Sequence, residues 1–361
     1  MEAADTAAAG PSRATPGSPA GEADPERPPT VRRPVAGRTW VRTVLLYGLT
    51  LVGAVTLIFL LPRLMPGDPL AALEDPDADL FIRDPQVREE ILAFYDLDGT
   101  LPEQFVRYLG GLAQGDLGWS IARNRPVAEM IRGALPWTLL LVGSALVLSA
   151  AMSFLAGLAA AWWRGSRVDR AIVVVLTVLR SVPEYVIALA ALLLFAVLLP
   201  IFPLAGGRTP FADHASAFAS VADIARHLAL PLAALTLSSL GSTFLLVRNT
   251  AISVLGEDYM VLARAKGLPE RVQRSRHVGR NALLPFLTQF GVQAGFAVGG
   301  ALFVEVVFAY PGMGTLILSA VEARDFPVLE AAFLVLAFTV LTANLLVELA
   351  YRHLDPRVRA T

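Results

Sequence analysis

Six stretches of mostly apolar residues dominate this sequence, and each is long enough to cross a lipid bilayer. A helix needs about 20 such residues to span a hydrocarbon core of roughly 30 Å. Only 17% of the residues are charged, compared with about 25% in soluble domains. We therefore predict an all-α integral membrane protein with six transmembrane helices. They cover about residues 44–61, 133–163, 171–199, 227–247, 281–304 and 327–351.

The positions of arginine and lysine predict the orientation of these helices. Basic residues gather before the first stretch, between the second and third, between the fourth and fifth, and after the sixth. All of these segments fall on one side of the membrane, and positive charge favours the cytoplasmic side. We therefore predict cytoplasmic N- and C-termini. The long connection over residues 62–132 then forms an outer loop, and residues 248–285 form a cytoplasmic loop.

Residues 1–39 differ from the rest of the chain, because they are rich in Pro, Ala, Gly and Ser and cannot bury a core. A signal peptide would instead place positive charge and a short apolar run at the start. We predict a disordered, Pro/Ala-rich cytoplasmic arm over residues 1–39. The transmembrane domain then covers residues 40–361.

The composition argues against several functions. The chain has no cysteine and only four histidines, and no two histidines share a helix face, so we predict no metal site. The net charge of −1 gives no reason to expect a nucleic-acid partner. The sequence also lacks a Gly-rich phosphate loop that ends in Lys-Ser or Lys-Thr. We therefore expect no catalytic residue and no cofactor bound by this chain.

The loop over residues 248–285 carries the signals of helix ends. Asp258 suits a helix N-terminus, where negative charge is favourable, and Arg264 suits a C-terminus. Gly267 suits the left-handed position that follows a helix. Pro269 then suits the first turn of another helix. We predict two short cytoplasmic helices with a sharp turn at Gly267.

Two interpretations of this loop remain open. In the first, its arginines only set the topology and attract anionic lipid, which suits residues 271–280. In the second, the turn docks on another protein, because Ala263 and Ala265 let a partner approach the backbone closely. The helix-end residues favour docking at the turn itself. The predicted docking residues are Ala263, Arg264, Ala265, Lys266, Gly267 and Leu268.

This loop resembles the permease motif of binding-protein-dependent ABC importers. The matching features are the run Ala-Arg-Ala-Lys-Gly at 263–267 and the later Pro285. More narrowly, the chain resembles the first permease subunit of dipeptide and oligopeptide importers, over about residues 40–359. Further matching segments follow in the family's order: 66–69, 115–120, 308–314, 323–327 and 354–357.

The resemblance implies a type I ABC importer permease-like bundle in the inner or plasma membrane of a prokaryote. It implies a second homologous permease subunit, two ATPase subunits that bind ATP and Mg²⁺, and an extracytoplasmic solute-binding protein, with membrane lipid around the bundle. The segment 263–268 would be the coupling helix that docks on an ATPase. Short peptides are the favoured substrate, and nickel chelates, glutathione and oligosaccharides are the alternatives.

Two charged residues, Arg180 and Glu184, lie inside the third stretch with Pro183 between them. Their spacing places them on one face of a helix, which Pro183 is expected to kink. Ionisable groups at this depth usually face the bundle interior. One interpretation is an ion pair that satisfies itself. The other is a polar patch on the transport pathway, where Arg180 faces the second permease subunit and the patch meets the charged ends of a peptide.

A third acidic position, Glu305, ends the fifth stretch just before residues 308–314. In one interpretation its side chain simply reaches the outer membrane surface. In the other it shapes an external gate together with Tyr310, Pro311 and Gly312.

Two other classes of protein fit the sequence less well. An intramembrane enzyme needs a nucleophile with a base nearby, but Ser144 and Ser149 have no His or Lys at a matching spacing. An ATP-independent secondary transporter would carry internal repeats and helices broken around coupling-ion ligands. The sequence shows no convincing repeat, and the capped turn at Gly267 would lack a purpose.

Overall fold

The computed structural model describes residues 36–64, 85–95, 97–213 and 216–354, and within these ranges the chain is almost entirely helical. In these ranges five helices are individually long and apolar enough to cross a membrane, and a bent pair of helices brings the number to six when its halves are counted as one span. This agrees with the predicted six-span, all-α fold. The five are α1 (Ala36–Leu64), α4 (Val127–Trp162), α7 (Ala217–Leu255), α10 (Arg280–Val307) and α12 (Phe326–Leu354).

The predicted arm over residues 1–39 lies outside the described residues, apart from the start of α1 at Ala36. The predicted segment 66–69 and the last predicted segment, 354–357, also lie outside them, except for Leu354. The side of the membrane on which each terminus lies therefore stays a prediction.

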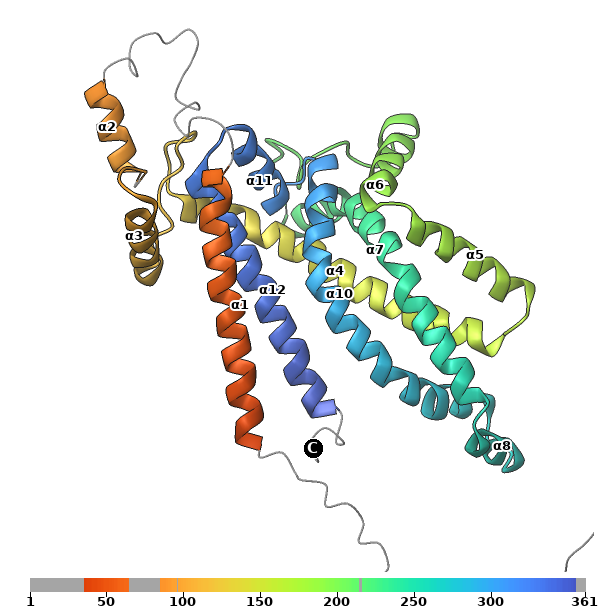
Figure 1. Ribbon diagram of the computed structural model, residues 1–361. Coiled ribbons are helices and arrows are strands. Elements are labelled where there is room, and N and C mark those ends of the chain that lie inside the picture. The colour runs from red at the N-terminus through yellow and green to blue at the C-terminus, as the bar shows by residue number, and fades with distance from the viewer. Residues whose placement is uncertain (1–35, 65–84, 96, 214–215, 355–361) are drawn as a thin grey trace, which may run out of the picture.

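Helix α7 is central to the bundle (Figure 1), where it packs against α4, α5 (Arg167–Ser181), α6 (Glu184–Leu192) and α10. At the other edge, α12 packs between α10 and α1. Gly157 on α4 allows a close crossing, because a Cβ there would lie 2.8 Å from the Val247 Cβ on α7. Small residues at such crossings let membrane helices approach one another.

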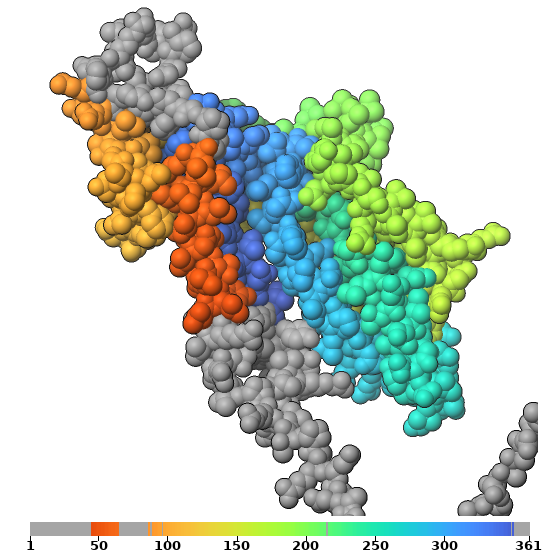
Figure 2. All heavy atoms as spheres, in the orientation of Figure 1, coloured from red at the N-terminus to blue at the C-terminus, as the bar shows by residue number. Residues whose placement is uncertain are grey.

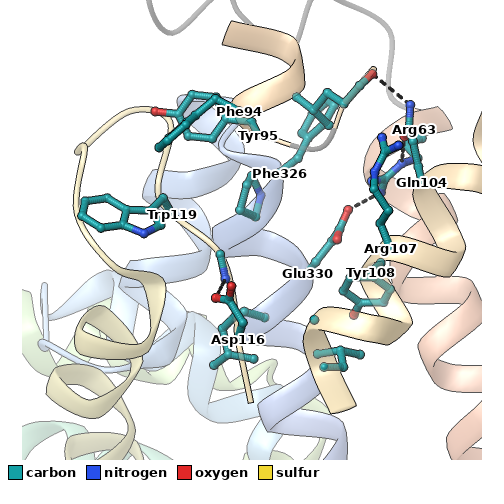
Figure 3. Close-up of a pocket in the computed structure, with 17 residues that line it drawn as sticks. Arg63, Phe94, Tyr95, Gln104, Arg107, Tyr108, Asp116, Trp119, Phe326 and Glu330 are labelled. Atoms are coloured by element: carbon teal, nitrogen blue, oxygen red, sulfur yellow. Dashed lines mark hydrogen bonds and ion pairs between the residues drawn. The ribbon is translucent and has the colours of Figure 1, made fainter. Parts of the chain in front are cut away.

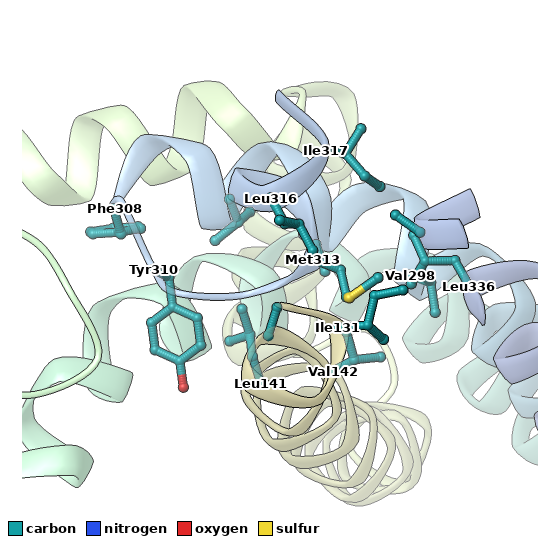
Figure 4. Close-up of a cluster of buried hydrophobic side chains, with 14 of the residues drawn as sticks. Ile131, Leu141, Val142, Val298, Phe308, Tyr310, Met313, Leu316, Ile317 and Leu336 are labelled. Carbon is teal, nitrogen blue, oxygen red and sulfur yellow. The ribbon is translucent and has the colours of Figure 1, made fainter. Parts of the chain in front are cut away.

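The largest buried cluster joins α4, α10, α12 and a short helix, α11 (Met313–Glu322), as Figure 4 shows. It also includes buried residues of α6 and α7. Tyr310 and Met313 are fully buried in it. Because this cluster draws on six helices, it fixes the turn between α10 and α11 in one place. Its other large members include Ile131, Leu141, Val142, Val298, Phe308, Leu316 and Leu336.

The third span is broken into two helices rather than kinked within one. Helix α5 (Arg167–Ser181) is followed by α6 (Glu184–Leu192) and a π-helical turn (Leu193–Leu198), and the two halves meet at 101°. Val182 is extended, with φ −93° and ψ 126°. Pro183 disfavours a helical residue before it and donates no hydrogen bond. The break therefore corrects the prediction of one continuous helix.

The two longest helices extend beyond the predicted spans. Helix α7 continues past Arg248 to Leu255. The charge of Arg248 does not end the helix, because this side chain forms an ion pair with Asp169. Its guanidinium donates to both carboxylate oxygens of Asp169 on α5, at 2.7 and 2.8 Å. The connection between α7 and α10 is consequently shorter than the predicted 248–285.

The end of the bundle opposite α8 (Asp258–Ala265) carries α2 (Pro85–Phe94), α3 (Leu101–Gln114) and α11 (Figure 1). Two sequence segments that matched the family, 115–120 and 323–327, meet here. The buried carboxylate of Asp325 accepts hydrogen bonds from the Ser120 hydroxyl and from the Ile121 amide, the latter at 3.1 Å. The segment after α3 is therefore fixed to the start of α12.

Candidate functional site

A short helix, α8 (Asp258–Ala265), forms the turn between α7 and the segment that leads into α10 (Figures 1 and 2). Two backbone hydrogen bonds close its C-terminus. The Gly267 amide donates to the Arg264 carbonyl at 2.9 Å, and the Leu268 amide donates to the Ala263 carbonyl at 3.2 Å. Gly267 has a φ of +67°, which a residue with a Cβ adopts only with strain. The predicted helix and its turn at Gly267 are confirmed.

One face of α8 is anchored in the bundle. Met260 is fully buried, and the Asn281 amide group at the start of α10 donates to the Tyr259 hydroxyl at 3.0 Å. Close-packed side chains transmit displacement rather than absorb it. A movement of α8 therefore moves the adjoining ends of three long helices. The cluster around Met260 comprises Leu158 and Ala161 of α4, Val247 and Ala251 of α7, Val278, and Ala282 and Phe286 of α10.

Ala263 belongs to this anchored face, which corrects its predicted role. It is only 4% exposed, so its small side chain lets α8 approach its own bundle rather than a partner protein. Ala265 lies on the exposed side and retains the predicted role.

The opposite face of α8 is open and largely apolar. Val261 and Leu262 are 60% and 55% exposed, and Arg264 and Lys266 are exposed beside them. Tyr259 lies at the border of the two faces, because it is 41% exposed while its hydroxyl is bound to Asn281. An apolar centre with a charged rim is the usual anatomy of a protein-binding surface. The geometry of α8 therefore combines a fixed face and a docking face on a helix of two turns.

The segment after the turn is longer than predicted. Pro269 precedes a helical segment, as expected, but α9 (Glu270–Val272) continues through a π-helical stretch (Gln273–Gly279) directly into α10. The Gln273 side-chain amide donates to the Leu268 carbonyl at 2.7 Å and fixes the turn to this helix. The predicted second short helix is thus the first part of a rod that reaches Val307.

At the far end of that rod, Glu305 is fully buried rather than at the membrane surface. Its carboxylate accepts two hydrogen bonds, one from the Thr138 hydroxyl of α4 at 2.6 Å and one from the Gly314 amide of α11 at 2.6 Å. The Thr138 oxygen in turn accepts the Met313 amide at 2.8 Å. Together Glu305 and Thr138 satisfy free amides at the N-terminus of α11. This geometry agrees with the interpretation in which Glu305 shapes the turn over residues 310–314.

The other predicted gate residues lie in the same turn. Tyr310 is fully buried, and its ring meets Trp137 edge to face at 5.6 Å between centroids. Burial raises the pKa of the Tyr310 phenol, with a smaller contribution from Glu305, so the hydroxyl stays protonated. Pro311 packs near Gly207, where a Cβ would lie 2.9 Å from the Pro311 ring. Gly312 has no room for a side chain, because a Cβ there would overlap the Glu305 carboxylate.

The structure does not bring Arg180 and Glu184 together on one helix face. Arg180 ends α5 and is exposed, while Glu184 begins α6 and is half-buried. A Cβ on Gly300 of α10 would lie 2.5 Å from the Glu184 carboxylate, so Glu184 is turned toward α10. Among the described residues no ion pair joins Arg180 to Glu184. The prediction of a pair on one continuous helix is therefore wrong, and Pro183 at the break is the reason.

Sequence reasoning missed a polar cluster where α1, α3 and α12 meet (Figure 3). Arg63 pairs with Glu330, and its Nε donates to Gln104 at 2.8 Å. The cluster lines a cavity of about 220 Å³. The Tyr108 hydroxyl, also at this cavity, is buried without a hydrogen-bond partner among the described residues. A basic residue at the end of the first stretch was the available signal, but its acidic partner lies 267 positions away.

Comparisons with known proteins fit this architecture. Residues 153–360 match the family model described as binding-protein-dependent transport system inner membrane component. A putative peptide permease protein of Brucella suis is 38% identical over 319 residues, which cover 88% of this chain and 98% of the relative. A glutathione transport system permease protein of Escherichia coli is 34% identical over 305 residues, which cover 84% and 92%.

These matches confirm the resemblance to permeases of the dipeptide and oligopeptide type. The chain is a multi-pass inner-membrane protein and the permease subunit of an ABC importer, with the type I permease fold. Its family is a transport family and not one of enzymes. The chain therefore belongs to the family of binding-protein-dependent transport system inner membrane components.

Proposed function

We propose that this chain forms half of the translocation pathway of an importer for short peptides. The other half would be a second homologous permease subunit. Two ATPase subunits, which bind ATP and Mg²⁺, would dock beneath the pair, and an extracytoplasmic solute-binding protein would deliver the substrate. Both termini and the arm over residues 1–39 would then lie in the cytoplasm.

The observation that carries this proposal is the two-faced geometry of α8. Met260 fixes one face in the bundle, while Val261 and Leu262 leave the other face open. The exposed face with Arg264, Ala265, Lys266 and Gly267 is the part proposed to enter a groove on an ATPase. Closure of the ATPase pair would displace α8, and the packed cluster would carry that displacement into α4, α7 and α10.

The broken third span supports a pathway role for Arg180, Pro183 and Glu184. An exposed arginine at this depth needs a polar or protein environment, because contact with lipid is costly. The second permease subunit and the pathway between the two would supply it. The first amides of α6 and the two charged side chains then offer partners for the charged ends of a peptide.

The names of the relatives support peptides as the substrate class. One relative is named as a peptide permease and another as a glutathione permease. Glutathione is itself a small peptide, so one class of substrate accounts for both names. Nickel chelates and oligosaccharides have no comparable support here. The buried turn over Glu305 and residues 310–312 would form the outer gate of this pathway.

The test is substrate-stimulated ATP hydrolysis by the intact importer in lipid vesicles. The solute-binding protein is loaded in turn with di- and tripeptides, glutathione, a nickel chelate or an oligosaccharide. We expect short peptides to stimulate hydrolysis and to accumulate inside the vesicles. Stimulation by a nickel chelate or an oligosaccharide alone would overturn the peptide assignment. Transport without ATP or ATPase subunits would overturn the importer mechanism.

A further inference from the structure

A long apolar groove opens on the bundle surface between α4, α5 and α7. Its volume is about 340 Å³ and its lining is almost entirely apolar. A dry cavity of about 150 Å³ already holds benzene, so this groove is large enough for part of an acyl chain. The groove is open at the surface of the helix bundle, because Met152 and Val175 on its rim are 43% and 55% exposed. The other lining residues are Ser153, Ala156, Ala171, Ile172, Leu176 and Leu240.

Three arginines lie at the end of this groove that is nearest to α8. Arg167 precedes the lining residue Ala171 by one helical turn. Arg164 and Arg170 lie three residues before and after Arg167. All three are exposed. None makes an ion pair or a side-chain hydrogen bond with the part of the chain that the structure describes.

The local sequence offers these arginines no free acid. Asp169 is the one acidic residue between Glu129 and Glu184. Both of its carboxylate oxygens accept the Arg248 guanidinium, and one also accepts the Gly165 amide at 2.9 Å. Asp169 also attracts Arg164, but this single carboxylate faces Arg248 and the three arginines of the row, so it cannot neutralise them all. A net positive patch therefore borders an apolar groove.

We propose that this groove and its arginines form a binding site for an anionic phospholipid. One acyl chain lies in the groove, and the headgroup phosphate and its extra negative charge meet Arg164, Arg167 and Arg170. Trp163, which is 52% exposed, marks the same level, since exposed tryptophans gather at the membrane interface. Each basic residue near a membrane surface favours anionic over neutral lipid.

Lipid retention by the purified full-length chain tests the proposal. After delipidation, phosphatidylglycerol or phosphatidylethanolamine with the same acyl chains is titrated, and bound lipid is counted by native mass spectrometry. We expect one phosphatidylglycerol to bind about tenfold more tightly than phosphatidylethanolamine. The triple change R164Q/R167Q/R170Q should abolish this preference. Filling the groove with Ala156→Leu and Ala171→Leu should weaken the binding of both lipids.

The matched control is R123Q/R125Q/R132Q, which removes three exposed arginines around the start of α4, at the end of that helix opposite the row. It should leave the preference unchanged. Equal loss in both triple variants, or no preference in the unaltered chain, would overturn the proposal. So would a groove-filling variant that retains lipid but fails to assemble with a second permease subunit. Size-exclusion profiles and thermal melting temperatures verify that each variant is folded.

Discussion

Two glycines show how single residues determine the two turns of this bundle. Gly267 is required for its backbone conformation, with φ +67° at the end of α8. Nothing lies within 4 Å of a Cβ built there, so space is not the constraint. Gly312 is the reverse case, because its φ of −96° is ordinary but its Cβ would overlap Glu305. A side chain is therefore disfavoured at Gly267 by the backbone conformation and at Gly312 by lack of space.

Replacing Gly312 with alanine should destabilise the outer turn. The added methyl group displaces the Glu305 carboxylate from the Gly314 amide and the Thr138 hydroxyl, and overpacking of this kind costs about 1–3 kcal/mol. We expect a lower melting temperature and reduced uptake. Gly299→Ala on the same rod is the control, because no atom lies within 4 Å of its Cβ. Equal melting temperatures for the two variants would show that the turn tolerates a side chain.

Replacing Gly267 with valine should abolish transport while leaving membrane insertion intact. A β-branched residue resists positive φ, at a cost of about 1–2 kcal/mol for the left-handed region, so the end of α8 would unwind. Gly267→Asn is the control, because asparagine tolerates this conformation. Uptake by vesicles at matched protein levels is the measurement. Normal uptake by the valine variant would mean that the turn does not transmit force.

The role of Gly267 at the turn could be predicted from the sequence, but the steric constraint on Gly312 could not. The turn at Gly267 is a local signal, since the capping residues stand beside it in the chain. The burial of Glu305 depends on Thr138 of α4 and on Gly314 of α11. Neither neighbour is implied by periodicity or by the run of residues around Glu305. Local chemistry is readable from sequence, whereas a carboxylate shared between helices is not.

At the scale of elements, α8 and the third span are the informative cases. The existence and ends of α8 were predictable, but which face it buries was not, because that depends on the cluster formed by α4, α7 and α10. The kink at Pro183 was also predictable. The full break of 101° depends on close crossings elsewhere, as at Gly241, where a Cβ would lie 2.6 Å from the Leu176 carbonyl oxygen.

Truncating a side chain on the buried face of α8 should have a different effect on transport from truncating one on the exposed face. Met260→Ala removes a buried side chain, a change that typically costs 2–5 kcal/mol in a core, and loosens α8 from the bundle. We expect the ATPase subunits to remain bound but ATP hydrolysis to proceed with little uptake. Leu262→Ala shortens an exposed side chain, so we expect a normal melting temperature and weaker ATPase binding. Co-purification and ATP hydrolysis per molecule transported separate the two outcomes.

The break in the third span leads to a separate expectation for Arg180. Replacing it with leucine should reduce uptake severely, since the proposed pathway would lose its exposed charge. Arg180→Lys keeps the charge and should retain part of the uptake. Protein levels in the membrane are measured in parallel to exclude misfolding. Uptake by the leucine variant at the level of the unaltered chain would assign Arg180 no role in transport.

At the scale of the whole molecule, the two turns belong to one mechanical unit. The helical rod that begins at Glu270, directly after α8, ends at Val307 beside the Glu305 turn. The rod is continuous through a π-helical stretch (Gln273–Gly279) and through Pro285, so it connects the two turns by one helical path. The existence and apolar composition of the spans were predictable because they are local properties, whereas the ends of the longest helices were not. The continuity of the rod through residues 273–279 was not, since the basic loop was expected to end before a new span begins.

The most direct test of this account is a site-specific crosslink between α8 and an ATPase subunit. The chain contains no cysteine, so Leu262→Cys provides a single exposed thiol, and Arg271→Cys provides a matched one beyond the turn. A short bifunctional reagent is applied to the assembled importer. We expect Leu262→Cys to crosslink to an ATPase subunit and to block uptake, while Arg271→Cys crosslinks far less. An α8 thiol that stays freely reactive and joins no ATPase subunit would contradict the coupling role.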